Sequence, residues 1–201
     1  PFIKIDNPVG SYLYDFTIPE NWDGKNIFLY FGAVKSAAYL WINGEMVGYT
    51  QGAKTPSEWD ITKYLQKGNN TLALEVYRWS DGSYLECQDF WRISGIERDV
   101  FLYAKNKISI SDFFVKSLLT NNYTDGYFNL DVEIINHEHN KQKTKLFIHA
   151  QVFDNNGKAI FDEKNKITVR KSKNILSNDF KTVFPEIKKW SAENPNLYKL
   201  L

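Results

Sequence analysis

Short runs of aromatic and β-branched residues recur along the whole chain, and Gly, Asn, Asp or Pro residues separate them. This composition fits the pleated, half-buried surface of a β-strand, and the flanking residues favour turns. The clearest runs are "SYLYDFTI" (11–18), "NIFLYFGAV" (26–34), "TLALEVYRW" (71–79), "DVFLYA" (99–104), "FNLDVEII" (128–135) and "KLFIHAQVFD" (145–154). The sequence therefore predicts an all-β protein.

Three connecting segments allow local predictions. Asn43-Gly44 lies between two apolar runs, and both residues tolerate the positive φ of a two-residue hairpin turn. The polar segment "DNNGK" (154–158) predicts another turn between strands. By contrast, "TPSEWDITKYL" (55–65) places Pro and Ser ahead of acidic residues and spaces its last apolar residues as in a helix, which predicts a short helical turn.

The chain changes character near residue 108, which suggests two domains. Five of its six tryptophans lie in residues 1–108, whereas residues 109–201 are rich in Lys and Asn. Apolar and polar residues alternate along the second part, which is similar to an immunoglobulin-type sandwich of antiparallel strands. Pro1 stands in place of an initiator methionine, and "NLYKLL" (196–201) reads as an interrupted strand. We therefore expect an excised segment whose last strand is incomplete and leaves an unpaired edge.

The charge balance excludes several partners. The chain has 25 basic and 24 acidic residues, a net charge of +1, so no extended field gathers nucleic acid or an anionic membrane surface. No apolar run approaches the roughly 20 residues that span a bilayer, and no signal peptide is visible. A single cysteine, Cys87, excludes an internal disulfide. It leaves the compartment open between bacterial cytoplasm and periplasm, because many exported bacterial domains lack disulfides.

One stretch departs from the strand pattern. "WSDGSYLECQDFWR" (79–92) concentrates aromatic rings, carboxylates, an amide, a thiol and an arginine without a strand or helix period. Such a segment is predicted to be a loop, and chemistry-bearing loops on rigid β scaffolds are frequent binding sites.

Other kinds of site have weaker support in the sequence. His137 and His139 alternate like metal ligands, but no cysteine or third histidine is near them in sequence, so a solvated loop is the better interpretation. No serine or cysteine lies beside a histidine in sequence, although a catalytic triad can assemble in space. Cys87 lies between Glu86 and Gln88, where negative charge disfavours the thiolate, and it is interpreted as a packing residue. No glycine-rich phosphate loop is present.

The mixture of aromatic and hydrogen-bonding residues in 79–92 suits a saccharide. An aromatic ring covers the apolar face of a pyranose, while carboxylates and amides bind its hydroxyls. A structural interpretation stands beside this one, because tryptophan and tyrosine also fill β-sandwich cores and aspartates also fasten loops. Composition alone favours the structural interpretation.

Four longer motifs add a resemblance to a known family. They are "NPVGSY" (7–12), "WINGEMVGYTQGAKTPSEWDIT" (41–62), "RWSDGSYLECQDFWRISGIERDVFLYA" (78–104) and "WSAENPNLY" (190–198). Together they closely resemble the β-galactosidases of glycoside hydrolase family 2. The resemblance implies a jelly-roll, galactose-binding-like β-sandwich over residues 1–108 and an immunoglobulin-like β-sandwich over 109–201. In that family a catalytic (β/α)₈ barrel follows.

The same resemblance implies one site residue. In the "QDFW" box, Asp89 matches a family aspartate that reaches into the active site, contacts the galactosyl group and ligates a monovalent cation, usually sodium. The neighbouring carboxylates and Arg92 are interpreted as scaffolding, with Trp79 and Trp91 as core aromatics. Asn7 is interpreted as the start of an Asn-Pro turn rather than as a substrate contact.

The resemblance places catalysis outside this chain. A retaining glycosidase needs an acid/base carboxyl and a nucleophilic carboxylate about 5 Å apart. In this family both are barrel glutamates, so no catalytic residue is expected here and the fragment alone should be inactive. The resemblance implies that the intact enzyme hydrolyses terminal β-D-galactosyl residues. It implies sodium at Asp89 and allows magnesium in the barrel. The partner of this segment would be the barrel itself, and the intact enzyme could be a homo-oligomer.

Two alternatives stay open. The intact protein could be a related β-glucuronidase or β-mannosidase, because these share the two entry domains. The segment could also be a free-standing carbohydrate-binding module, which would bind sugar without a barrel.

Overall fold

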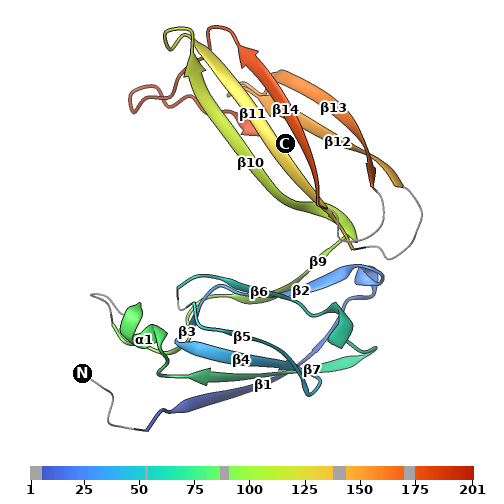
Figure 1. Ribbon diagram of the computed structural model, residues 1–201, viewed down its shortest axis with the longest axis vertical. Helices are drawn as coiled ribbons and strands as arrows, with labels where there is room; N and C mark the ends of the chain where they lie inside the picture. Colours follow the sequence, from blue (N-terminus) through green and yellow to red (C-terminus); the bar gives the residue numbers. More distant parts are fainter. Residues whose placement is uncertain (1–5, 53, 87–90, 138–143, 170–174) are drawn as a thin grey trace. The chain divides into compact units, whose positions relative to one another are not determined.

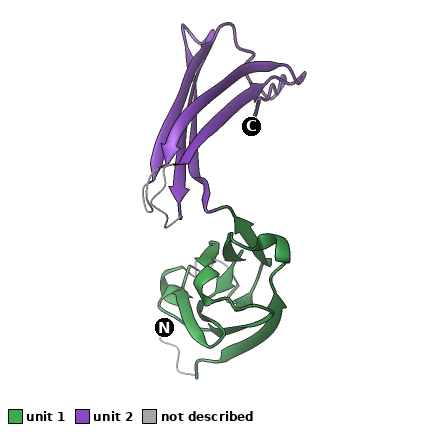
Figure 2. Cartoon of the chain, turned by 90° about the vertical axis from the view of Figure 1, so that its right-hand side faces the viewer, with its two compact units in different colours: residues 1–106 green, residues 107–201 purple. Residues whose placement is uncertain are grey.

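The computed structural model describes residues 6–52, 54–86, 91–137, 144–169 and 175–201. The chain forms two compact units, residues 1–106 and residues 107–201 (Figure 2). Both are built from antiparallel sheets with only short helical turns, which confirms the predicted all-β fold class (Figure 1).

The first unit contains two main sheets. One has the strand order β1–β7–β4–β5, with β1 (Val9–Thr17), β7 (Asn69–Tyr77), β4 (Ala37–Ile42) and β5 (Glu45–Thr50). The other has the order β6–β2–β9, with β6 (Ser57–Asp60), β2 (Asn26–Phe31) and β9 (Val100–Lys105). A small pair, β3 (Val34–Lys35) with β8 (Gly95–Ile96), and the 3₁₀ turns η1 (Glu20–Trp22) and η2 (Thr62–Tyr64) complete it.

The core of the first unit follows from the alternation of its strands. Successive side chains point to opposite faces, so every second residue of β4 and β7 faces inward. These residues meet the inward side chains of the other sheet in one buried cluster. It contains Ile27, Leu29, Phe31, Val34, Ala38, Leu40, Ile42, Ile61, Leu72, Leu74 and Val76.

The predicted hairpin turn is confirmed. Asn43 and Gly44 adopt φ values of 52° and 81°, and Ile42 pairs with Glu45 across the two-residue loop. The Asn43 amide also donates to the carbonyl of Tyr64 at 2.9 Å, so the turn is fastened to η2.

The helical turn predicted over 55–65 is wrong in its first half. Ser57–Asp60 is strand β6, whose residues pair with β2. The ring centroids of Trp59 and Phe31 are 5.7 Å apart, with the two rings nearly perpendicular. Only Thr62–Tyr64 is helical, where Asp60 accepts the Thr62 N–H at 3.0 Å. Tertiary pairing and the burial of an aromatic ring therefore outweighed the local helix signals.

The second unit is a sandwich of two three-stranded sheets. The first has the order β10–β11–β14, with β10 (Ile108–Thr120), β11 (Asp125–Asn136) and β14 (Leu176–Phe184). The second has the order β13–β12–β15, with β13 (Ala159–Val169), β12 (Thr144–Phe153) and β15 (Lys199–Leu200). All pairs are antiparallel, as the alternating pattern predicts.

The core of the second unit lies between these sheets. Its buried side chains are Phe128, Leu130, Val132, Ile134, Ile148, Ala150, Val152, Phe161 and Phe180. The predicted turn at 154–158 is confirmed: Asp154 and Lys158 are joined by a backbone hydrogen bond of 2.9 Å, and Gly157 has a φ of 77°. Within the described parts of the chain, no helix has the length and apolar character needed to cross a membrane.

Candidate functional site

The described beginning of the 79–92 stretch is held by hydrogen bonds to Asn7 and Pro8, the two residues that precede strand β1. Asn7 accepts the Trp79 N–H through Oδ1 and donates through Nδ2 to the Trp79 carbonyl, both at 2.9 Å. The Arg78 N–H donates to the Pro8 carbonyl at 3.0 Å, and the Arg78 guanidinium lies 5.2 Å from the centroid of the Trp79 ring. Asn7 is therefore a clamp on this loop, a role that sequence reasoning missed because its partner is 72 residues away.

A short helix follows the clamp where the sequence predicted irregular loop. Helix α1 (Gly82–Leu85) begins after Asp81, whose carbonyl accepts the Tyr84 N–H at 3.0 Å (Figure 1). The Ser83 hydroxyl accepts the Ser80 N–H at 3.0 Å and closes the turn. Four residues are too few to show a helical period, so the sequence pattern gave no signal.

A concavity of about 280 Å³ lies where this loop meets the outer face of the β1–β7–β4–β5 sheet. We call it the Tyr39 concavity; it is lined by Ala37, Tyr39, Tyr49, Gln51, Tyr77, Trp79, Ser80 and Asp81. Tyr39 occupies its middle: its ring centroid is 4.7 Å from that of Tyr49 and 5.9 Å from that of Tyr77. Cross-strand pairing of β4 with β5 and β7 brings these rings together.

Hydrogen-bonding groups surround the three rings. The Tyr49 hydroxyl donates to Gln51 Oε1, and the Tyr77 hydroxyl donates to Glu75 Oε2 at 3.1 Å. The bond to Glu75 raises the pKa of Tyr77, and burial, with Tyr39 and Asp81 nearby, raises the pKa of Tyr49. Both phenols are therefore uncharged at neutral pH, with hydroxyls that donate and accept hydrogen bonds.

Two lining residues contain buried polar atoms without a partner. Among the residues that the structure describes, Trp79 Nε1 and Ser80 Oγ have no hydrogen-bond partner. Both atoms are inaccessible to solvent, so a ligand in the concavity would contact the rings and the Asp81 carboxylate rather than these two atoms. Rings, an amide and a carboxylate in one concavity match the chemistry that binds sugars.

The principal site residue of the sequence analysis, Asp89, lies outside the described residues, as does Cys87. Trp91 is described, and its interpretation as a core aromatic is wrong, because it is 80% exposed. The Lys35 ammonium donates to its carbonyl at 3.2 Å, which fixes the backbone and leaves the ring outside. Arg92 is also exposed, and it forms no ion pair with any described residue.

Of the two histidines that alternate like metal ligands, the structure describes only His137. His137 donates its backbone N–H to the Lys107 carbonyl at 2.7 Å, while His139 lies outside the described residues. In the described part of the chain, no group of three or more His, Cys, Asp or Glu side chains could hold a metal ion.

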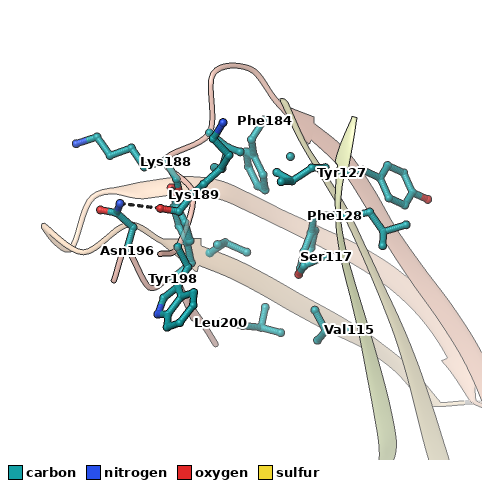
Figure 3. Close-up of a pocket in the computed structure, with 16 residues that line it drawn as sticks. Val115, Ser117, Tyr127, Phe128, Phe184, Lys188, Lys189, Asn196, Tyr198 and Leu200 are labelled. Atoms are coloured by element: carbon teal, nitrogen blue, oxygen red, sulfur yellow. Dashed lines mark hydrogen bonds between the residues drawn. The ribbon is translucent and has the colours of Figure 1, made fainter. Parts of the chain in front are cut away.

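The second unit contains a larger and chemically different hollow. This groove of about 420 Å³ lies between the β10–β11–β14 sheet and the segment that leads into β15 (Figure 3). Its lining is mainly apolar, including Val115, Phe128, Phe184 and Leu200. A sugar needs several hydrogen-bond partners, so this groove is poorly suited to bind one.

Comparisons with known proteins agree with the fold. The family model described as "Glycosyl hydrolases family 2, sugar binding domain" matches residues 1–106, and the model "Glycosyl hydrolases family 2" matches residues 108–201. The chain therefore belongs to glycoside hydrolase family 2.

Two of the similar curated relatives are β-galactosidases. A β-galactosidase of Priestia megaterium is 44% identical over 97% of this chain, and one of Clostridium acetobutylicum is 40% identical over 98%. These alignments cover 19% and 21% of the two relatives, so the chain spans about a fifth of their length. It corresponds to their N-terminal part, and the catalytic domain is not present in it.

Solved structures share the fold. A β-glucuronidase of Bacteroides uniformis superimposes with a TM-score of 0.86 at 24% identity, covering 97% of this chain and 24% of that one. A family 2 member from Bacteroides cellulosilyticus superimposes with a TM-score of 0.80 at 22% identity, covering 96% and 26%.

Proposed function

We propose that this chain is the non-catalytic N-terminal portion of a retaining β-galactosidase that hydrolyses terminal β-D-galactosyl residues. The observation that supports this most directly is the 36–44% identity to several β-galactosidases over at least 97% of the chain. The catalytic carboxyl pair would come from the catalytic domain of the longer protein, and the fragment alone would be inactive.

In this proposal the 79–92 loop supplies one wall of the active site. Asp89 accepts hydrogen bonds from the galactosyl hydroxyls and so fixes the sugar relative to the reacting carbon. Orientation of this kind converts binding energy into rate. The Asn7 clamp and helix α1 hold the described start of this loop in place.

The exposed apolar side chains on either side of Asp89 support docking on the rest of the enzyme. Leu85 and Trp91 are both strongly exposed, although a soluble surface seldom presents two such groups on one short segment. We propose that the barrel of the longer protein covers them.

A cation at Asp89 is part of the same proposal. One carboxylate offers a hard oxygen, which suits sodium, but a complete shell needs further oxygen ligands. No described cluster of acidic side chains supplies them, so the longer protein would have to provide the others, and any magnesium would lie in its barrel.

Titration of the 201-residue chain tests whether the site is composite. Galactose and lactose would be added with and without sodium while amide shifts of residues 79–92 and of the Tyr39 concavity are followed by NMR. We expect no saturable shift below about 10 mM, because a wall that has lost its partners binds weakly. Saturable binding at the concavity would instead favour a free-standing carbohydrate-binding module.

Substitution in the longer enzyme tests the role of Asp89. Asp89→Asn should lower kcat/KM for a β-galactoside by about 100-fold, since loss of orientation affects turnover as well as binding. Asp23→Asn, at an exposed carboxylate outside the 79–92 loop and the Tyr39 concavity, is the control and should change it less than threefold. An equal loss in both variants would contradict the role of Asp89. Preference for a β-glucuronide or a β-mannoside over a β-galactoside in the unsubstituted enzyme would contradict the proposed substrate.

A further inference from the structure

Strand β3 of the first unit carries a buried lysine. Lys35 is 7% exposed, and among the residues that the structure describes it is the only buried one of the Asp, Glu, Lys and Arg types. Lysines usually extend along a surface and keep the ammonium in water. Burial of that group is unfavourable unless hydrogen bonds or opposite charges replace its hydration. The position of Lys35 therefore points to a specific task for its ammonium.

The ammonium contacts the end of the 79–92 stretch, which we call the exit. Lys35 Nζ donates to the Trp91 carbonyl at 3.2 Å, and Trp91 follows Asp89 by two residues in the sequence. The backbone of Lys35 pairs with Gly95, whose φ of 119° strongly favours glycine. The side chain and the backbone of one residue therefore hold the chain at Trp91 and again where it enters β8.

The residue that follows Lys35 holds the start of the same stretch, which we call the entry. The Ser36 N–H and the Ser36 hydroxyl both donate to the Tyr77 carbonyl at 3.0 Å. Tyr77 precedes Trp79 by two residues in the sequence. Two neighbouring residues, Lys35 and Ser36, therefore hold the exit and the entry of one loop.

The entry and the exit differ in how many contacts support them. At the entry, Tyr77 also pairs with Ala37 on β4, so several backbone contacts support the Ser36 hydroxyl. At the exit, the Trp91 ring is 80% exposed, so packing of that ring holds little. Among the described residues, the hydrogen bond from Lys35 is the contact that fixes the Trp91 backbone. Loss of one side chain should therefore affect the exit more than the entry.

We propose that Lys35 is a positioning residue for the loop that contains Asp89. Its ammonium fixes the backbone at the exit and so limits the conformations that are open to Asp89 two residues earlier. Lys35 itself does not touch the sugar; it acts through the loop. This inference rests on the proposed function, because it assigns Lys35 to the same site.

NMR on the 201-residue chain tests the contact without any sugar. The unsubstituted chain should show a scalar coupling across the hydrogen bond, between Lys35 Nζ and the Trp91 carbonyl carbon. Lys35→Met keeps an unbranched apolar side chain but removes the ammonium. It should lower the order parameter of the Trp91 amide from about 0.85, typical of rigid backbone, to below about 0.6. The order parameter of Trp79 should not change, because the Asn7 clamp holds it independently.

Kinetics of the longer enzyme test the positioning role. Lys35→Met should lower kcat/KM for a β-galactoside about tenfold, with kcat reduced as well as KM raised, because a misplaced contact group affects turnover. Lys35→Arg keeps the charge and the donors and should restore kcat/KM to within about threefold. Lys67→Met, at an exposed lysine of the same unit, is the matched control and should stay within about twofold.

A double variant separates positioning from a merely structural role. Residues that act as a unit are not additive, so Lys35→Met combined with Asp89→Asn should lose no more activity than Asp89→Asn alone. A lysine that only stabilised the fold would leave kcat of the folded enzyme unchanged, and its effect would add to that of Asp89→Asn.

Three outcomes would overturn the proposal: no coupling from Lys35 to Trp91, an unchanged Trp91 order parameter in Lys35→Met, and additive losses in the double variant. Circular dichroism checks that Lys35→Met folds, and the coupling in the unsubstituted chain decides the question if it does not. A fully active Asp89→Asn would instead contradict the proposed role of Asp89, while the NMR measurements would still show whether Lys35 holds the exit.

Discussion

The two hollows of this molecule differ in chemistry more than in size. The Tyr39 concavity of the first unit is the smaller, yet three tyrosine rings, an amide and a carboxylate line it. The groove of the second unit is larger and mainly apolar. Because a sugar hydroxyl must exchange its water for protein hydrogen bonds, the smaller hollow matches the chemistry of a sugar better than the larger one does.

The same contrast extends to the sheets beneath the hollows. In the first unit the inward residues of β4 are almost completely buried, so the Tyr39 concavity rests on a closed core. In the second unit β10 pairs along its length with β11 but remains exposed on both faces. A strand can therefore be fully paired and still lack a covering layer. The groove beside β10 results from the missing layer and not from missing strand pairing.

The largest expected effect tests whether the two cores are independent. Leu40 in the first unit and Phe180 in the second are 0% and 1% exposed. Leu40→Ala and Phe180→Ala should each lower the free energy of unfolding of their own unit by about 3–5 kcal/mol, because a cavity remains where the side chain was. Urea unfolding followed by amide exchange in each unit measures this.

The control for both variants is an exposed apolar position. Leu118→Ala, on β10, should change the unfolding free energy by less than about 0.5 kcal/mol. If Leu40→Ala destabilised the second unit as much as the first, the description of two separate cores would be wrong.

A smaller effect is expected from the polar support of the first unit. Asn70 is completely buried, accepts hydrogen bonds from the Asn43 side chain and the Gln66 N–H, both at 2.8 Å, and donates to the Gln66 carbonyl at 3.0 Å. Asn70→Ala should cost about 2–3 kcal/mol, because it leaves several buried partners unsatisfied. Asn178→Ala, a half-buried position in the second unit, is the control and should cost far less, as chemical denaturation would show.

The smallest effect concerns the exposed charges of the second unit. Hydrogen bonds from His149 and Gln151 lower the pKa of Asp162 from its ordinary value of 3.8. A lowered carboxyl pKa adds stability above the ordinary pKa and loses it as pH falls through the lowered value. His149→Ala should therefore raise the pKa of Asp162 and weaken the acid dependence of stability below pH of about 4.

NMR titration of the carboxyl carbons measures the pKa values of Asp162 and Asp179, and Asp179 serves as the control. Lys181 lowers the pKa of Asp179 in the same unit. Lys181→Ala should raise the pKa of Asp179 and leave that of Asp162 unchanged. If His149→Ala changed the pKa of both Asp162 and Asp179, the His149–Asp162 and Lys181–Asp179 pairs would not be independent.

Much of the fold could be read from alternation and turn chemistry. The strand runs, the Asn43-Gly44 hairpin and the 154–158 turn depend on neighbours in sequence, and all three are confirmed. The prediction over 55–65 is confirmed only at Thr62–Tyr64. It failed over Ser57–Asp60 because these residues pair with β2 and Trp59 packs on Phe31, and local spacing contains no information about those contacts.

The candidate site was only partly visible in the sequence. Its stretch, 79–92, was recognisable from composition and family motifs, and the sequence alone determined the all-β class and the chemistry available to the loop. Only the tertiary structure placed Tyr39, Tyr49 and Tyr77 together and made Asn7 the clamp of Trp79. It also left the inner face of β10 uncovered. The physical reason is that strand pairing joins residues far apart in the chain, whereas composition and periodicity record only what lies nearby.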